Sequence, residues 1–189
     1  MNLITLNSLV AAATPFVRID GVHTQDWCRN VSSGSRFGPW RYEADYTVLD
    51  KATWARTGEV LYFATDRLGK VRLVGQSSGR LKDRWRESPM HDVSSRVPFG
   101  RKALFHSTAW CAIEDGFDVE VPPFTVKALF RPELELICRG GDPSLTHALQ
   151  QLETDKYRLV YHVEQVILSS LGHALGLWNR QGVRVQAVA

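Results

Sequence analysis

The sequence predicts an α+β domain with a small antiparallel sheet, and three observations carry this prediction. Two β-rich runs lie on either side of a short turn, at 59–66 and 71–75. A third β-rich run follows much later, at 124–130, directly after two prolines. Stretches with helical periodicity lie between and after these runs. We therefore expect a three-stranded antiparallel sheet flanked by helices, with an N-terminal extension and insertions.

The N-terminal part of the chain has weaker patterns. The start, "MNLITLNSLVAAATPF", fits a first strand or helix. Residues 20–45 are rich in glycine, serine, aromatic and charged residues, so we expect an irregular arm or loop there. Residues 46–58 predict a short strand followed by a helical turn. We divide the chain into an N-terminal extension, a core and a C-terminal tail, at 1–57, 58–180 and 181–189.

The clearest local pattern is the predicted hairpin. "EVLYFATD" is its first strand, "RLGK" supplies a glycine for the turn, and "VRLVG" is its second strand. A Gly-Gln-Ser-Ser-Gly loop then leads into "RLKDRWRE" at 80–87, whose residues favour a helix that ends near Pro89.

Three further helices are expected. "GRKALFHSTAWCAIEDG" at 100–116 is bounded by two glycines and places apolar residues on one helical face. Residues 143–157 favour a helix, and residues 159–172 favour another, with Gly172 as its C-terminal cap. The buried stripe expected on the last helix consists of Val163, Val166, Ile167, Ser170 and Leu171.

Composition limits the class of protein. With 189 residues, of which 44% are hydrophobic and 23% charged, the chain is long and apolar enough for one domain with a core. A net charge of +3 permits an anionic partner without demanding one. Three distant cysteines without a CxxC pair argue against a zinc site or a disulfide framework, and favour a reducing compartment. No apolar run is long enough to cross a bilayer, so we expect a cytoplasmic protein without a membrane partner.

The hairpin, the loop and the basic helix together resemble the GIY-YIG nuclease family. "VLY" at 60–62 stands where the family has its first tripeptide, and Tyr62 is its tyrosine. "LVG" at 73–75 stands where the second tripeptide belongs. "GQSSGRLKDRW" is similar to the family's GQS…L..RW pattern with one extra loop residue, which places Arg84 on the catalytic arginine.

The resemblance continues less specifically toward the C-terminus and covers roughly residues 58–180. "HVEQVILSSL" resembles the helix that supplies the family's metal-binding glutamate, and Glu164 is the match. "LWN" is similar to a tail of some restriction enzymes in the family, which places Asn179 near the site.

The chain departs from the family pattern at three positions. Val60 replaces the first glycine, and Leu73 replaces the second tyrosine. A leucine can neither hydrogen-bond nor position a water. Arg72 points to the other face of a two-faced strand, so it does not simply replace the tyrosine. Ser88 stands where many members have a histidine one turn after the arginine, and the nearest histidine is His91.

The resemblance implies a Mg²⁺- or Mn²⁺-dependent endonuclease that hydrolyses double-stranded DNA with a water nucleophile. Mg²⁺ takes few protein carboxylates and keeps most of its waters, so Glu164 alone can hold it. Arg84 is permanently charged and forked, which suits a phosphate. Tyr62 would act as general base or orient the water. The residues expected to hold the nucleic-acid backbone are Gln76, Ser77, Arg80, Lys82, Arg86 and Asn179.

Several interpretations stay open. A restriction-like enzyme would form a homodimer whose symmetry matches a palindromic site. A non-catalytic DNA-binding module on the same fold is consistent with Leu73. A nuclease toxin acting on a competitor's nucleic acid is a third possibility. Structurally, Tyr62 could be a core aromatic, Arg84 part of a solvated helix face, and Glu164 an exposed residue on the polar side of its helix.

Overall fold

The computed structural model describes residues 1–26, 37–85, 90–92, 98–99, 123–140, 143–150, 159–177 and 179. No helix within these ranges combines the length and the apolar character that crossing a membrane requires. The elements, in chain order, are α1 (Leu3–Ala12), β1 (Thr14–Asp26), β2 (Phe37–Val48), α2 (Lys51–Ala55), β3 (Val60–Thr65), β4 (Val71–Ser77), α3 (Leu81–Trp85), β5 (Met90–Asp92), β6 (Pro98–Phe99), β7 (Phe124–Phe130), α5 (Arg131–Arg139), α6 (Pro143–Gln150) and α7 (Leu159–Leu175).

One antiparallel sheet organises the described part of the chain, in the strand order β4-β3-β7-β1-β2-β5-β6. The three predicted strands are confirmed and lie side by side as β4-β3-β7. The expectation of a sheet with only three strands is wrong, because β1 and β2 extend it as two further long strands. Two short strands, β5 and β6, complete its far edge. The α+β class is confirmed.

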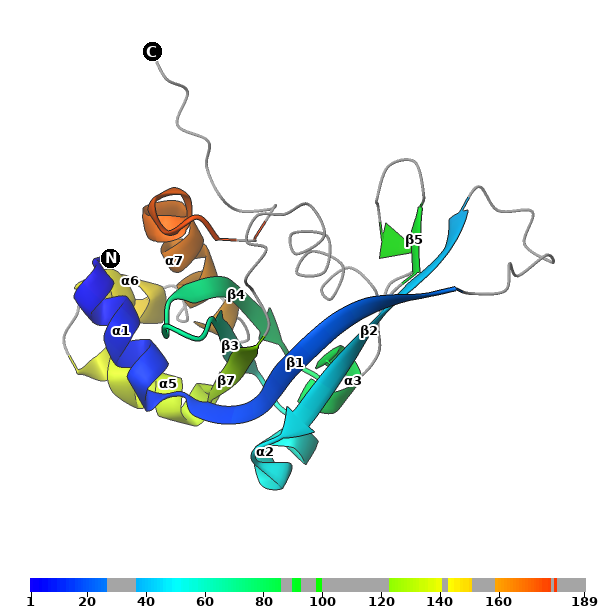
Figure 1. The fold of residues 1–189 in the computed structure, drawn as a ribbon. Coiled ribbons are helices and arrows are strands. Elements are labelled where there is room, and N and C mark those ends of the chain that lie inside the picture. The colour runs from blue at the N-terminus through cyan, green and yellow to red at the C-terminus, as the bar shows by residue number, and fades with distance from the viewer. Residues whose placement is uncertain are drawn as a thin grey trace, which may run out of the picture.

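The N-terminal extension is more regular than its composition indicates. Its start is the helix α1, and the strand and helical turn expected at 46–58 are the end of β2 and α2. The irregular arm expected at 20–45 is wrong where the structure describes it, because β1 reaches Asp26 and β2 begins at Phe37. These two strands pair from Val17 opposite Val48 to Asp26 opposite Trp40, and they form the long ribbon in Figure 1. The backbone pairing of β1 with β2 therefore outweighs the loop-like composition of this segment.

The sheet is buried on both faces at β3, and alternate side chains of this strand show which helices cover each face. All six residues of β3 are buried. Leu61 and Phe63 pack in one core with residues of α1, α5, α6 and α7. Tyr62 packs in a second core with Leu81 and Trp85 of α3. Because neighbouring side chains of a strand point to opposite faces, α3 and α7 lie on opposite sides of the sheet (Figure 1).

The helices match the predictions in part. α6 begins at Pro143 as expected and is described to Gln150, whereas the helix expected at 100–116 lies outside the described residues. α5, which is not among the predicted helices, follows β7 directly. The proposed cap at Gly172 is wrong, because α7 continues to Leu175 and the glycine with a positive φ of 61° is Gly176.

The buried stripe of α7 also differs from the expected one. Val163 and Ile167 are buried as predicted, but Ser170 is exposed, and Val166 and Leu171 are partly exposed. Leu168, which the expected stripe omits, is buried. The buried face of α7 is rotated relative to the expected stripe, because α7 packs against both the sheet and its neighbouring helices α5 and α6.

An ion-pair network fastens the start of β3 to the start of α5. The backbone N–H of Arg131 donates to the carbonyl of Glu59 at 2.9 Å. The guanidinium of Arg131 binds the carboxylates of Glu59 and Glu135, at 3.2 and 2.8 Å. The hydrogen bond that Nε of Arg131 donates to the carboxylate of Glu135 is the main cause that raises the pKa of Arg131. β7 therefore passes directly into α5, and this junction is bound to the residue that precedes β3.

Cys138 is expected to be unreactive in the folded protein. Its side chain is buried in α5, and burial raises the pKa of its thiol to about 12, with a smaller contribution from Glu135. Thiolates, not thiols, react with disulfide reagents. In a Cys28→Ser, Cys111→Ser variant, we expect Cys138 to react with such a reagent at pH 8 at least about 100-fold more slowly when native than when denatured.

The same shift has a consequence for stability at alkaline pH. The unfolded chain ionises this thiol near its ordinary pKa of 9.0, whereas the folded chain keeps the proton to about 12. The contribution of Cys138 is therefore complete below pH 9 and is lost as the pH rises toward 12. Denaturation curves should show this decline, and Cys138→Ala should reduce it. Fast native labelling would contradict the burial of the thiol.

Candidate functional site

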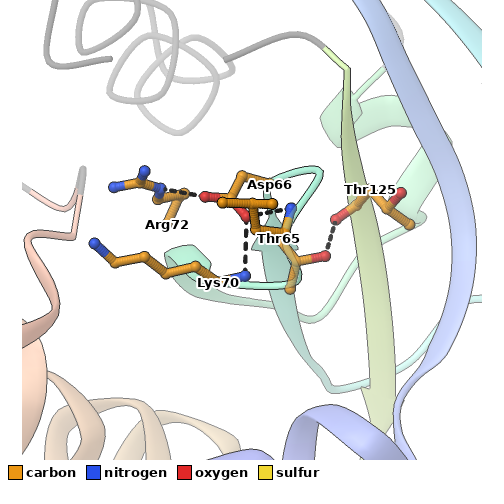
Figure 2. Close-up of polar contacts among 6 residues, drawn as sticks. Thr65, Asp66, Lys70, Arg72 and Thr125 are labelled. Atoms are coloured by element: carbon orange, nitrogen blue, oxygen red, sulfur yellow. Dashed lines mark hydrogen bonds and ion pairs between the residues drawn. The ribbon is translucent and has the colours of Figure 1, made fainter. Parts of the chain in front are cut away.

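Asp66 closes the β3–β4 hairpin. One carboxylate oxygen, Oδ1, accepts hydrogen bonds from the backbone N–H groups of Leu68 and Lys70, both at 2.9 Å. The other, Oδ2, accepts from Nε of Arg72 at 2.9 Å (Figure 2). Gly69 has a φ of 78°, in the left-handed region that glycine adopts without strain. The side chain of Asp66 therefore stabilises the turn, because it binds both the backbone N–H groups and the guanidinium of Arg72.

Arg72 occupies an irregularity of β4 and does not replace the missing tyrosine. The pairing shifts between Ala64 opposite Leu73 and Thr65 opposite Val71, so Arg72 is the extra residue of a bulge. Its guanidinium pairs with Asp66, and the two side chains are only 16% and 10% exposed. Leu73 is buried in the core that contains Tyr62. The polar function of the second motif tyrosine is thus absent from position 73, and Arg72 is engaged at the turn.

Tyr62 lies between β4 and α3. It stands directly opposite Gly75, and a Cβ atom at Gly75 would overlap the ring and the hydroxyl group of Tyr62. On its other side, the ring meets the indole of Trp85 edge-to-face, with centroids 5.8 Å apart and planes at 88°. We expect the turn after β4 to place Tyr62 on the same side as Arg84; Tyr62 contacts Trp85 of the same helix, whereas the side chain of Arg84 lies outside the described residues. The phenolic oxygen is buried in this arrangement.

The loop after β4 leads directly into α3. The hydroxyl of Ser77 accepts a hydrogen bond from the N–H of Gly79 at 3.2 Å, and Arg80 forms a β-bridge with Thr57. Arg80 is exposed and Lys82 is partly exposed. Both are therefore accessible to a phosphate backbone. Arg84 lies within α3, but its side chain and the whole of Arg86 lie outside the described part of the chain.

Glu164 lies on α7, at the margin of its buried face. Val160 and Leu168, one turn before and after it, are buried, while Glu164 itself is partly exposed. Glu164 is therefore neither buried in the core nor fully exposed. Gln76 stands opposite Leu61 and so lies on the α7 side of the edge strand β4.

The candidate residues are thus distributed over both sides of β4. Tyr62 and α3 lie on one side, whereas Gln76 and the helix that carries Glu164 lie on the other. The helix α7 packs against β4 more than against β3, so it lies along the edge of the sheet. The resemblance implies that Tyr62, Arg84 and Glu164 converge on one cleft. Because α3 and α7 lie on opposite sides of the sheet, the described residues do not show this convergence.

Asn179 binds the edge of β4. Its Oδ1 accepts from the backbone N–H of Val74 at 3.1 Å, and its Nδ2 donates to the carbonyl of Val74 at 2.6 Å. The side-chain amide therefore pairs with β4 as a backbone peptide would. Asn179 therefore lies beside the hairpin, held by its amide to the edge strand β4.

Sequence reasoning missed two residues that organise this region. Asp66 has a recognisable signal, because an aspartate before a glycine-containing turn often binds backbone N–H groups two residues on. The sequence suggests Gly75 only as a turn glycine between strand and helix, but it lies within β4 opposite Tyr62, and the need for its missing side chain follows from the ring that lies above it.

Glu164 is the carboxylate that the resemblance assigns to a divalent cation. In the ranges that the structure describes, no three His, Cys, Asp or Glu side chains gather as metal ligands. Mg²⁺ is commonly held by one or two carboxylates together with waters and substrate phosphate, so the partly exposed carboxylate of Glu164 fits that requirement. Comparisons of the chain with family models, with curated proteins and with solved structures give no match.

Proposed function

We propose that this chain is a divalent-metal-dependent endonuclease of the GIY-YIG type, which hydrolyses phosphodiester bonds of double-stranded DNA in a restriction-like role. One observation carries the proposal. The segments "VLY" and "LVG" form neighbouring strands, with Tyr62 opposite Gly75, and their hairpin leads directly into the helix that contains Arg84. In this register the two tripeptides meet at a single pair, Tyr62 opposite Gly75.

Each residue has a distinct task in this proposal. Arg84 would bind the phosphate and stabilise its developing charge, with Arg80, Lys82, Gln76 and Ser77 along the backbone. Glu164 would hold Mg²⁺, which when bound supplies Lewis-acid stabilisation and a more acidic water. Tyr62 would orient that water or accept its proton. We further propose a cytoplasmic homodimer that places one site on each DNA strand.

A second candidate, a non-catalytic DNA-binding module, is favoured by specific observations. The hydroxyl oxygen of Tyr62 is buried, and the neighbouring motif position is the apolar Leu73. Glu164 and Arg84 belong to helices on opposite faces of the sheet. Such a module would retain the cations that bind phosphate and would not cleave.

Nicking of a supercoiled plasmid in Mg²⁺ or Mn²⁺ tests the proposal. Glu164→Gln keeps the shape of the side chain but removes its charge, so we expect cleavage to fall at least about 100-fold while DNA affinity is retained. Glu133→Gln is the matched control, because Glu133 is exposed and pairs with Arg56 elsewhere on the surface. Its rate should equal that of the wild type.

Two outcomes would decide against parts of the proposal. A wild-type protein that binds DNA but nicks it with neither metal would be the non-catalytic module. Cleavage by Glu164→Gln at the wild-type rate would remove Glu164 from the reaction.

Arg84→Lys is expected to separate phosphate recognition from general electrostatics. Lysine keeps the charge but loses the forked pair of donors, so we expect a cleavage rate at least about tenfold lower, which corresponds to about 1.4 kcal/mol. Lys82→Ala should instead weaken binding modestly and reduce its salt dependence. Equal effects of the two changes on rate and on salt dependence would mean that α3 is only a basic surface.

A further inference from the structure

The position of α3 depends on two buried side chains. α3 has five residues, and a helix of this length is not stable through its own hydrogen bonds. Leu81 and Trp85 are four residues apart, so they lie on one face, and both are 0% exposed. Their packing, together with the β-bridge between Thr57 and Arg80, therefore decides where the backbone of α3 lies.

Of the two side chains, Trp85 makes the directional contacts. Its indole meets Tyr62 edge-to-face, and it also meets Phe124 of β7 at a centroid distance of 6.4 Å with planes at 63°. Edge-to-face pairs prefer a defined geometry, whereas an aliphatic side chain packs in several. Leu81 shares the same core as an aliphatic side chain. Trp85 thus determines the rotation of α3 as well as its distance from the sheet.

The surface on which Trp85 rests is itself rigid. The ring of Tyr62 fills the space that the missing side chain of Gly75 leaves, so it cannot move closer to β4. Tyr62 belongs to β3, which is paired on both sides by β4 and β7. The contact therefore joins α3 to a fully paired strand of the sheet.

We propose that Trp85 is a positioning residue for Arg84. Arg84 directly precedes Trp85 in α3, so the contacts of the indole with Tyr62 and Phe124 fix the backbone from which the arginine reaches the phosphate. A small misplacement of a group that stabilises a transition state costs rate more than it costs substrate binding. This inference rests on the proposed function, because it concerns the arginine of the proposed reaction.

A double-mutant cycle tests the proposal in the full-length protein, with a labelled DNA duplex cleaved in Mg²⁺. Trp85→Met keeps an apolar side chain but loses the aromatic edge, and we expect kcat to fall at least about tenfold with KM changed less than about twofold. Trp85→Phe should recover most of the rate. In an Arg84→Ala background, Trp85→Met should have no further effect on kcat, because the group that it positions is absent.

Leu134→Val is the matched control, since it changes a buried side chain of α5 in the other core and leaves α3 untouched. Its effect on kcat should be the same in the wild-type and Arg84→Ala backgrounds. Thermal denaturation shows which variants are folded. If Trp85→Met does not fold, Phe124→Leu takes its place in the cycle, with an expected loss of about threefold that also vanishes without Arg84.

The outcomes separate this inference from the function on which it rests. Loss of the Trp85→Met effect in the Arg84→Ala background supports the positioning role. If the wild-type enzyme is active and the effects of Trp85→Met and Arg84→Ala on kcat multiply in the double variant, the positioning role is overturned. Trp85 is then a general core residue. A wild-type protein without metal-dependent cleavage overturns the proposed function, and the positioning of a catalytic arginine with it.

Discussion

Gly75→Ala is expected to lower the free energy of unfolding by about 3 kcal/mol, as overpacking of a rigid core does. A Cβ atom at this position would overlap the ring and the hydroxyl group of Tyr62. The ring cannot retreat, because the indole of Trp85 covers its other side and Tyr62 is completely buried. Chemical denaturation measures the change, and the midpoint should shift strongly.

A matched glycine and a second background make this prediction specific. At Gly79 an added Cβ would meet nothing nearer than the hydroxyl oxygen of Ser77 at 3.9 Å, so Gly79→Ala should change stability by less than about 0.5 kcal/mol. In a Tyr62→Ala background the obstacle is gone, and Gly75→Ala should add less than about 1 kcal/mol. Equal costs at Gly75 and Gly79 would contradict the packing of Tyr62 on β4.

The sequence predicts the hairpin well because its signals are local. β-branched and apolar residues lie on both sides of a turn that contains Gly69, and both strands and their connection follow from that pattern. β7 is similarly distinct.

The strands of the N-terminal extension could not be predicted in the same way. β1 and β2 are joined to the sheet through contacts between β1 and β7, whose residues are more than 100 positions apart, such as Thr14 opposite Ala128. Glycine, serine and charged residues in this part of the chain indicate a loop when local propensity alone is considered. The ladder of backbone hydrogen bonds provides the missing stabilisation.

The two sides of the candidate site could not be predicted either. Periodicity identifies the apolar face of α7, but it does not tell on which side of the sheet that face packs. The alternation of Leu61 and Tyr62 between two cores decides this question, and it separates α7 from α3. If Glu164 and Arg84 act on the same phosphate, Glu164 therefore has to reach it around the edge strand β4, from the opposite side of the sheet.

Asp66→Ala is expected to destabilise the protein by about 3 kcal/mol, because it removes one partner of a largely buried ion pair and the acceptor of two backbone hydrogen bonds in the turn. The side chain of Arg72 is 16% exposed and its guanidinium would lose its carboxylate, and the N–H groups of Leu68 and Lys70 would lose their partner. Asp66→Asn keeps an acceptor for the turn, so its cost should be about half as large.

The comparison of Asp66 with Asp20 shows whether the hairpin turn is special. Asp20 also binds two side chains, Arg18 and Thr47, but it lies on the exposed surface of β1 and β2. Asp20→Ala should therefore change the denaturation midpoint much less than Asp66→Ala. Because a shift of one position in the pairing of β4 would turn every side chain to the opposite face, loss of Asp66 should also lower any cleavage activity that depends on Tyr62 opposite Gly75. Partial recovery of stability in Asp66→Asn, Arg72→Met would assign the loss to the unpaired guanidinium, whereas equal stability of Asp66→Ala and Asp20→Ala would show that the turn is held by its backbone alone.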